Sequence, residues 1–138
     1  MPGCSTATSL AAADDAGTEK ADMDIYNGWF DLKPGESDTA LADAIAGYMG
    51  YLQDNGLIEG WRLSRRKLGL GPAQLPEFHL MMEVRDLAQL EQAFAHVASR
   101  AEPVETAHHA VNSRVRQAMF ALYRDFPDAV RRRGEEKF

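Results

Sequence analysis

The chain has 138 residues and a formal net charge of −6, and its only cysteine is Cys4. No apolar stretch approaches the ~20 residues that a membrane-spanning helix needs, so the sequence predicts no contact with a membrane. A single cysteine leaves no disulfide within the chain and no cysteine metal cage, which predicts a reducing, cytoplasmic location.

The first 22 residues are small or polar and include few large apolar side chains. Such a segment cannot bury enough surface to offset its ordering entropy, and it lacks the basic start and apolar core of a secretory signal. We predict a disordered N-terminal tail at 1–22, one folded domain at 23–128 and a solvated C-terminal tail at 129–138. An alternative is that translation starts at Met23, because a strand pattern begins directly after it.

Three segments alternate apolar and polar side chains as half-buried strands do, and they span 24–32, 60–68 and 77–84. Seven polar or aromatic side chains occupy the alternate positions of these strands, which face away from the apolar side of the sheet: Asn27, Trp29, Asp31, Arg62, Arg66, His79 and Glu83. One polar sheet face of this kind predicts a ligand cavity or a subunit interface. Arg62 and Arg66 alternate away from Arg65 and Lys67, so the basic residues form no single patch and we expect no nucleic-acid partner.

Two amphipathic helices separate these strands. Ser37 and Asp38 are cap residues before an apolar stripe at helical spacing, and Asn55 followed by Gly56 is a helix-stop signal. Asp86 caps a second apolar stripe. Residues 69–76 hold two Gly and two Pro, and we expect a loop that is either a plain hairpin connection or a flap over a pocket.

The last part of the chain is open to two interpretations. Pro103 and the spacing of Val104, His108 and Val111 predict a helix at about 103–113. Residues 117–125 either continue that helix or form a fourth strand. We favour the strand, because it completes the β-α-β-β-α-β order of a ferredoxin-like α+β domain, with a four-stranded antiparallel sheet and helices on one face.

Four segments carry a family resemblance: MDIYNGWFDLKPG at 23–35, GLIEGWRLSRRKLGLGP at 56–72, EFHLMMEVRDL at 77–87 and ALYRDFPD at 121–128. With them the chain resembles a bacterial family of uncharacterised small proteins within the dimeric α/β-barrel superfamily. The resemblance implies a homodimer in which two four-stranded sheets face each other, and it implies no activity. A sheet with helices on one face only also needs a cover for its other face, which independently favours a second copy.

The candidate site residues of the first three strands lie on the polar sheet face, and Tyr123 of the expected fourth strand is within reach of it; the sequence leaves the face assignment of the first and fourth strands open. His79 is the candidate catalytic base, with a carboxylate on the same strand; the alternative is a satisfied ionic cluster at a dimer interface. The ligand-binding candidates are Asn27, Trp29, Arg62, Arg66, His79, Glu83 and Tyr123.

The remaining histidines give weaker signals. His108 and Asn112 share a helix face, but a metal site usually needs three protein ligands, so we expect no metal. His108 also lies on the apolar stripe, where a buried ring bonded to a backbone carbonyl is expected. His96 lies off the stripe of its helix and is expected to be solvated.

Two functional classes follow. The first, which we favour, is a homodimeric small-molecule-binding or stress-associated protein without a bound cofactor. The alternative is a small monooxygenase-like enzyme, cofactor-independent or haem-degrading, with its pocket between the sheets. Some haem-degrading members of the superfamily use Asn, Trp and His, and the chain has these residue types in Asn27, Trp29 or Trp61, and His79 or His108.

Overall fold

A computed structural model describes residues 22–127 of the chain. Apart from Asp22, the tails predicted at 1–22 and 129–138 lie outside the described residues. The elements in chain order are β1 (Asp24–Leu32), α2 (Asp38–Asp54), β2 (Gly60–Arg65), β3 (Phe78–Val84), α3 (Leu87–Ala98), α4 (Val104–Asn112) and β4 (Val115–Arg124).

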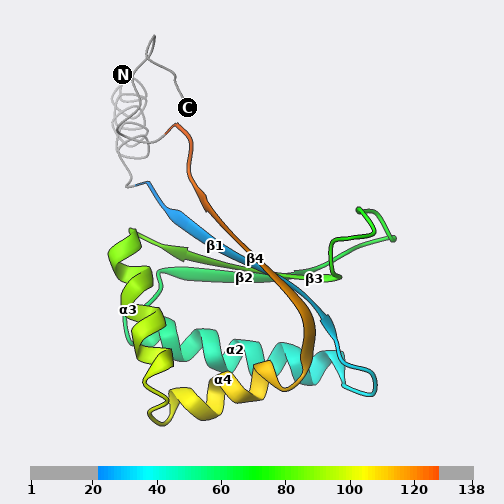
Figure 1. The fold of residues 1–138 in the computed structure, drawn as a ribbon, viewed down its shortest axis with the longest axis horizontal. Helices are drawn as coiled ribbons and strands as arrows, with labels where there is room; N and C mark the ends of the chain where they lie inside the picture. The colour runs from blue at the N-terminus through cyan, green and yellow to red at the C-terminus, as the bar shows by residue number, and fades with distance from the viewer. Residues whose placement is uncertain (1–21, 128–138) are drawn as a thin grey trace, which may run out of the picture.

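The strands form one antiparallel sheet in the order β2-β3-β1-β4. This is the predicted ferredoxin-like α+β arrangement, with α4 as an added helix before the last strand (Figure 1). The choice of a fourth strand over a continued helix is confirmed. The second strand is shorter than predicted, because Leu68 and Gly69 have φ of 57° and 66° and turn the chain into the following loop.

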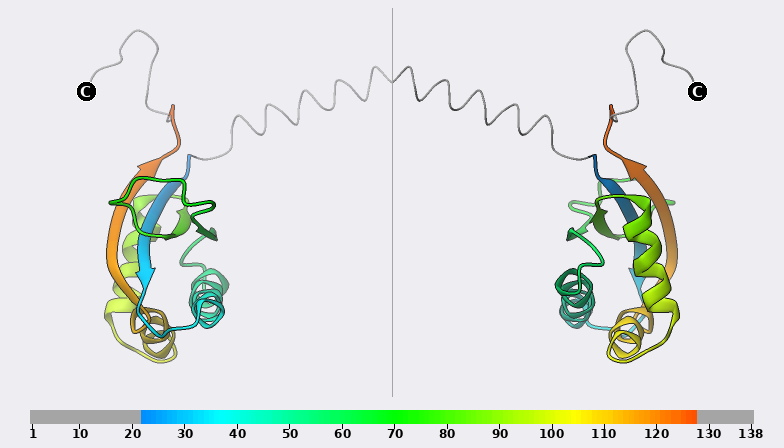
Figure 2. Two further views of the ribbon diagram at one scale, coloured as in Figure 1. Left: turned by 90° about the vertical axis from the view of Figure 1, so that its right-hand side faces the viewer. Right: turned by 90° about the vertical axis from the view of Figure 1, so that its left-hand side faces the viewer.

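All three described helices lie on one face of the sheet, as the side views make plain (Figure 2). The core forms where α2 meets this face, and Leu41, Ile45 and Met49 are almost completely buried there. The predicted caps start the helices: Ser37 Oγ accepts a hydrogen bond from the Ala40 amide at 3.2 Å, and the Asp86 carboxylate accepts one from the Gln89 amide at 2.8 Å.

The opposite face of the sheet is covered by no element of residues 22–127. Strand register places the predicted polar side chains there, with Trp29 beside His79 and Asn27 beside Met81. Arg62 pairs with Met81 from the other side. We call this surface the open face. None of the helices between residues 22 and 127 is long and apolar enough to cross a membrane.

The edge strand β4 is held by β1 alone and is mostly exposed. On the helix side, Phe120 lies over Gly28 of β1, and a Cβ added to Gly28 would come within 3.2 Å of the Phe120 ring. The glycine therefore gives the aromatic ring room to lie close to the neighbouring backbone.

The Gly- and Pro-rich loop projects from one end of the sheet (Figure 1). The Arg66 guanidinium donates hydrogen bonds to the carbonyl oxygens of Leu75, Pro72 and Pro76 within this loop. A Cβ at Gly71 would lie 2.7 Å from Arg66 Nε, so a larger residue there would make the Arg66 side chain shift. The loop is tied to itself through Arg66.

Candidate functional site: a cavity behind the sheet and a cluster on its open face

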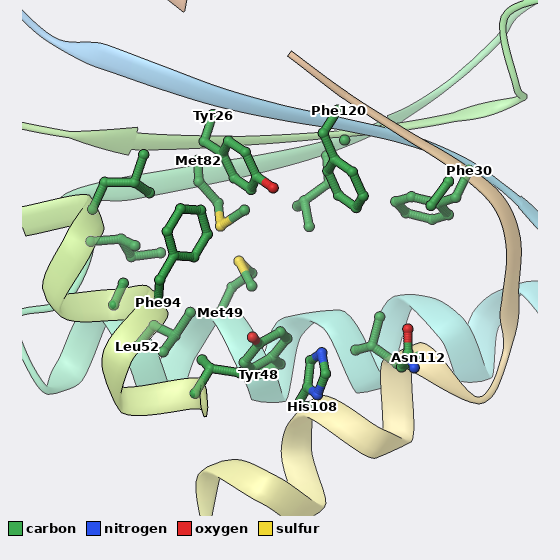
Figure 3. A pocket seen from close by; sticks show the side chains of 18 of the residues that line it. Tyr26, Phe30, Tyr48, Met49, Leu52, Met82, Phe94, His108, Asn112 and Phe120 are labelled. Carbon is green, nitrogen blue, oxygen red and sulfur yellow. The ribbon is translucent and has the colours of Figure 1, made fainter. Parts of the chain in front are cut away.

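A cavity of about 320 Å³ lies between the sheet and the helices (Figure 3). Side chains from β1, β3 and β4 form its roof, and side chains from α2, α3 and α4 form its walls and floor. Apolar groups make up most of the lining, including Met49, Leu52, Met82 and Val111. The cavity is open to solvent on one side, because Phe94 and Phe120 of its lining keep 45% and 61% of their surface exposed.

Three aromatic rings form one side of the cavity. The Tyr26 ring stacks on Phe120 with centroids 5.6 Å apart, and it meets Phe94 edge-on at 5.3 Å. Figure 3 shows Tyr26 and Phe120 projecting from the sheet and Phe94 approaching from α3. Offset and edge-to-face contacts of this kind are the favourable geometries for aromatic pairs, and they give the cavity flat walls.

The polar groups of the cavity gather on the helix side. Tyr48 of α2 and His108 of α4 are ring neighbours, with centroids 5.5 Å apart, and Asn112 lies one turn further along α4. Burial raises the pKa of Tyr48 to about 12, so its phenol keeps its proton at neutral pH and can donate a hydrogen bond. The cavity can therefore hold an apolar body and present polar groups to one side of it.

The histidine expectations need correction. His108 was expected to bind a backbone carbonyl, but within the described residues its ring contacts Tyr48 and lines the cavity. His96 was expected to be solvated, but its Nε2 lies 2.8 Å from the Tyr51 hydroxyl and its ring is half-buried. The pair joins α3 to α2.

On the open face, the structure brings together three of the predicted residues. His79 Nε2 lies 2.8 Å from Asn27 Oδ1, and the His79 ring stacks on Trp29 with centroids 4.7 Å apart. Asn27 Nδ2 donates to the carbonyl oxygens of Ile25 and Ala121. Because its amide nitrogen is engaged, Asn27 presents oxygen to His79, and the imidazole carries its proton on Nε2.

The other predicted residues lie apart from this cluster. Arg66 is engaged in its loop. Arg62 and Glu83 line a separate hollow of about 250 Å³ with Trp61 and Met81, and Tyr123 is an exposed residue of β4. The open face therefore has one compact polar cluster, Asn27–Trp29–His79, rather than a single site of seven residues.

The stability of the folded chain should depend on pH through His79. Burial lowers the pKa of His79 below its usual value of 6.5, so the folded state binds fewer protons here than the unfolded state. The contribution is fully present above about pH 6.5 and is lost as the pH falls. We expect the unfolding free energy to decrease between about pH 7.5 and pH 5, and to decrease less in His79→Gln. Urea denaturation across that range measures both, and equal slopes for the two proteins would contradict the assignment.

Sequence reasoning missed the cavity. His108 was expected on the apolar stripe of its helix, and no binding role was predicted for Tyr26 or Tyr48. One feature of the sequence could have indicated the cavity: Tyr48 and His108 place a hydroxyl and an imidazole on the otherwise apolar stripes of two different helices. Which stripes face each other across a void depends on packing, which periodicity alone does not reveal.

Together, the sheet order, the helices on one face and the open opposite face define a ferredoxin-like α+β protein. A family model described as a family of unknown function, DUF6614, matches residues 23–138, and the chain belongs to that family. None of the curated proteins matches the chain by sequence.

Solved structures with the same fold include proteins of different activities. A hydroxynitrile lyase from Passiflora edulis is 15% identical, with a TM-score of 0.56 over 75% of this chain and 93% of its own. SnoaB, a cofactor-independent oxygenase from Streptomyces nogalater, is 9% identical, with a TM-score of 0.58 over 80% and 99%. A dimeric ferredoxin-like protein of unknown function from a Jannaschia species is 9% identical, with a TM-score of 0.56 over 73% and 97%. Similarity at this level of identity shows the fold alone.

Proposed function

We propose that this protein is a homodimer that binds a small, mainly apolar organic molecule in the cavity between its sheet and its helices. The observation that carries the proposal is the cavity itself. A space of about 320 Å³ falls in the range of ligand pockets, and its apolar lining with a few convergent polar groups is typical of them. Left without a ligand, the cavity leaves the apolar rings of Phe94 and Phe120 exposed to water, and a bound apolar molecule would cover them.

The lining favours a particular kind of ligand. The flat rings of Tyr26, Phe94 and Phe120 suit a planar or ring-containing molecule, which would stack as the rings already do with each other. The Tyr48 phenol can donate to a carbonyl or hydroxyl oxygen of that molecule, and Asn112 can donate or accept. The ligand we propose is therefore an apolar ring compound with at least one oxygen function.

The open face supports the homodimer. It carries Trp29, Met81, Met119 and Tyr123, and the last two have 44% and 60% of their surface exposed. A sheet whose second face carries large apolar side chains needs a cover, and a second copy supplies one of matching size. The dimeric state of the Jannaschia protein agrees with this proposal. In that arrangement the predicted open-face residues serve the interface.

A second candidate function is catalysis without a cofactor. The supporting observation is the pairing of His108 with Tyr48 at the cavity, because an imidazole beside a protonated phenol can move a proton on a bound molecule. The fold also occurs in proteins named as a lyase and as an oxygenase. His79, the base proposed from the sequence, lies on the other side of the sheet from this cavity.

Native mass spectrometry of gently purified protein tests these proposals together. We expect a dimer that carries an extra mass, which acid denaturation releases as a small molecule. A released molecule that stays unchanged on incubation with fresh protein supports binding, and one that is converted supports catalysis.

Met81→Arg should give a folded monomer, because it places a charge at the centre of the open face. Gln92→Arg, on an exposed position of α3, should remain a dimer. A wild-type monomer at micromolar concentration would contradict the homodimer.

A further inference from the structure

His108 lines two neighbouring hollows. A second hollow of about 360 Å³ adjoins the cavity, and the two share Val97, Ala98, His108 and Asn112 in their linings. Beyond these shared residues, the second hollow is lined by Arg100, Glu105 and His109, where α3 ends and α4 begins. A polar hollow, which we call the mouth, therefore adjoins the apolar cavity at this end.

Arg100 is the unusual residue of this mouth. It follows Ser99, the C-cap of α3, and has φ of 56°, a left-handed conformation in which its Cβ is disfavoured. Glycine is the common residue at such a position. The negative end of the helix dipole favours a cation here, but a cation elsewhere in the last turn would gain as much without left-handed backbone. An arginine at a strained position of a pocket mouth indicates a use for its side chain.

The charged residues of the mouth include Glu105, whose position has a structural reason, and Arg100, whose position has no such reason. Within the described residues, Arg100 forms no salt bridge. Glu105 lies in the first turn of α4, where the helix dipole favours an acid, so its presence has a structural reason. His109 is an exposed neighbour that can donate a hydrogen bond. Arg100 is thus an exposed guanidinium in the hollow that adjoins the apolar cavity, where it is available to an anion.

We propose that the ligand is an amphiphilic acid, with its ring system in the apolar cavity and its carboxylate or similar anionic group at the mouth on Arg100. This inference rests on the proposed ligand cavity and names the chemical class of its ligand. The guanidinium can bind a carboxylate with two parallel hydrogen bonds, which gives orientation as well as affinity. The shared residues His108 and Asn112 lie along the path between the two ends.

Two fluorescent probes with the same aromatic body test the inference: anilinonaphthalene sulfonate, which is anionic, and phenylnaphthylamine, which is neutral. We expect the wild-type protein to bind the sulfonate about threefold to tenfold more tightly, because one partly exposed charge pair is being added. Arg100→Gly should abolish this preference and leave the affinity for phenylnaphthylamine unchanged. Glu105→Gln should increase the preference, because it removes a like charge from the mouth.

Leu68→Gly is the matched control. Leu68 is also left-handed, with φ of 57°, and it lies in the exposed loop away from the cavity. In both variants glycine replaces a residue with a left-handed backbone conformation, so neither should melt at a lower temperature than wild type. Only Arg100→Gly should change the preference for the sulfonate over phenylnaphthylamine. Equal binding of the two probes by wild type, or a preference that survives in Arg100→Gly, would overturn the anion site and leave the cavity proposal standing. Failure of both probes to bind would overturn both proposals.

Discussion

Leucine in place of Gln89 is expected to lower the free energy of unfolding by about 2–3 kcal/mol. Gln89 is 1% exposed, and its side chain joins three segments. Its Oε1 accepts from the Arg85 amide at 2.8 Å, and its Nε2 donates to the Gly56 carbonyl at 3.0 Å and to Glu59 Oε2 at 2.8 Å. Leucine has a similar volume, but it removes this partner from the Arg85 amide and the Gly56 carbonyl, whereas Glu59 Oε2 keeps its ion pair with Arg85 Nη1 at 2.8 Å. Urea denaturation followed by circular dichroism measures the loss.

Gln92→Leu provides the control for this prediction. It makes the same chemical change at an exposed position three residues further along α3. A surface substitution of this kind should alter stability by less than about 0.5 kcal/mol. If the two leucine variants unfold at the same urea concentration, the buried amide network does not hold α3 in place.

Phenylalanine in place of Val111 is expected to weaken phenylnaphthylamine binding by about tenfold or more, which is about 1.4 kcal/mol. Val111 lies on α4 and lines the cavity, so a phenyl ring there would occupy space that the ligand needs. The protein should stay folded, since the added ring fills an existing void rather than a packed core. Fluorescence titration gives the affinity, and a melting curve gives the stability.

Two further variants sharpen this test. Val111→Ala enlarges the cavity, and it should keep or improve binding while lowering stability. Ala46→Phe adds the same ring at an exposed position of α2 outside the cavity lining, and it should leave binding unchanged. Wild-type affinity in Val111→Phe would mean that the probe binds elsewhere on the protein.

The fold could be predicted from the sequence because the local helix-start and helix-stop residues agreed with the strand order of a ferredoxin-like domain. Caps at Ser37 and Asp86 and the stop at Asn55–Gly56 lie at the helix ends that the structure shows. The fourth strand was chosen on topology, since periodicity allowed a helix there as well. The match to a family of unknown function agrees with the predicted resemblance to an uncharacterised family, and the similar solved structures agree with the predicted fold.

The candidate site was accessible only in part. Strand parity put Asn27, Trp29 and His79 on one face, and register then brought them into contact. Parity failed for Arg66, because β2 ends at Arg65 and the chain turns away. The cavity was hidden for a different reason: the sheet and three helices must leave space between them, and no local sequence pattern encodes that space.

The position of β4 links the two halves of the proposed function. On its helix side, β4 carries Phe120, which forms a wall of the cavity, and on its other side it carries Tyr123. The Ala121 carbonyl oxygen of β4 also accepts a hydrogen bond from Asn27 Nδ2 of the open-face cluster. A strand held by one neighbour and shared by two binding events would couple them thermodynamically. Any ligand that strengthened association of the subunits would itself be bound more tightly by the dimer, and by the same factor. Ligand affinity would then rise with protein concentration.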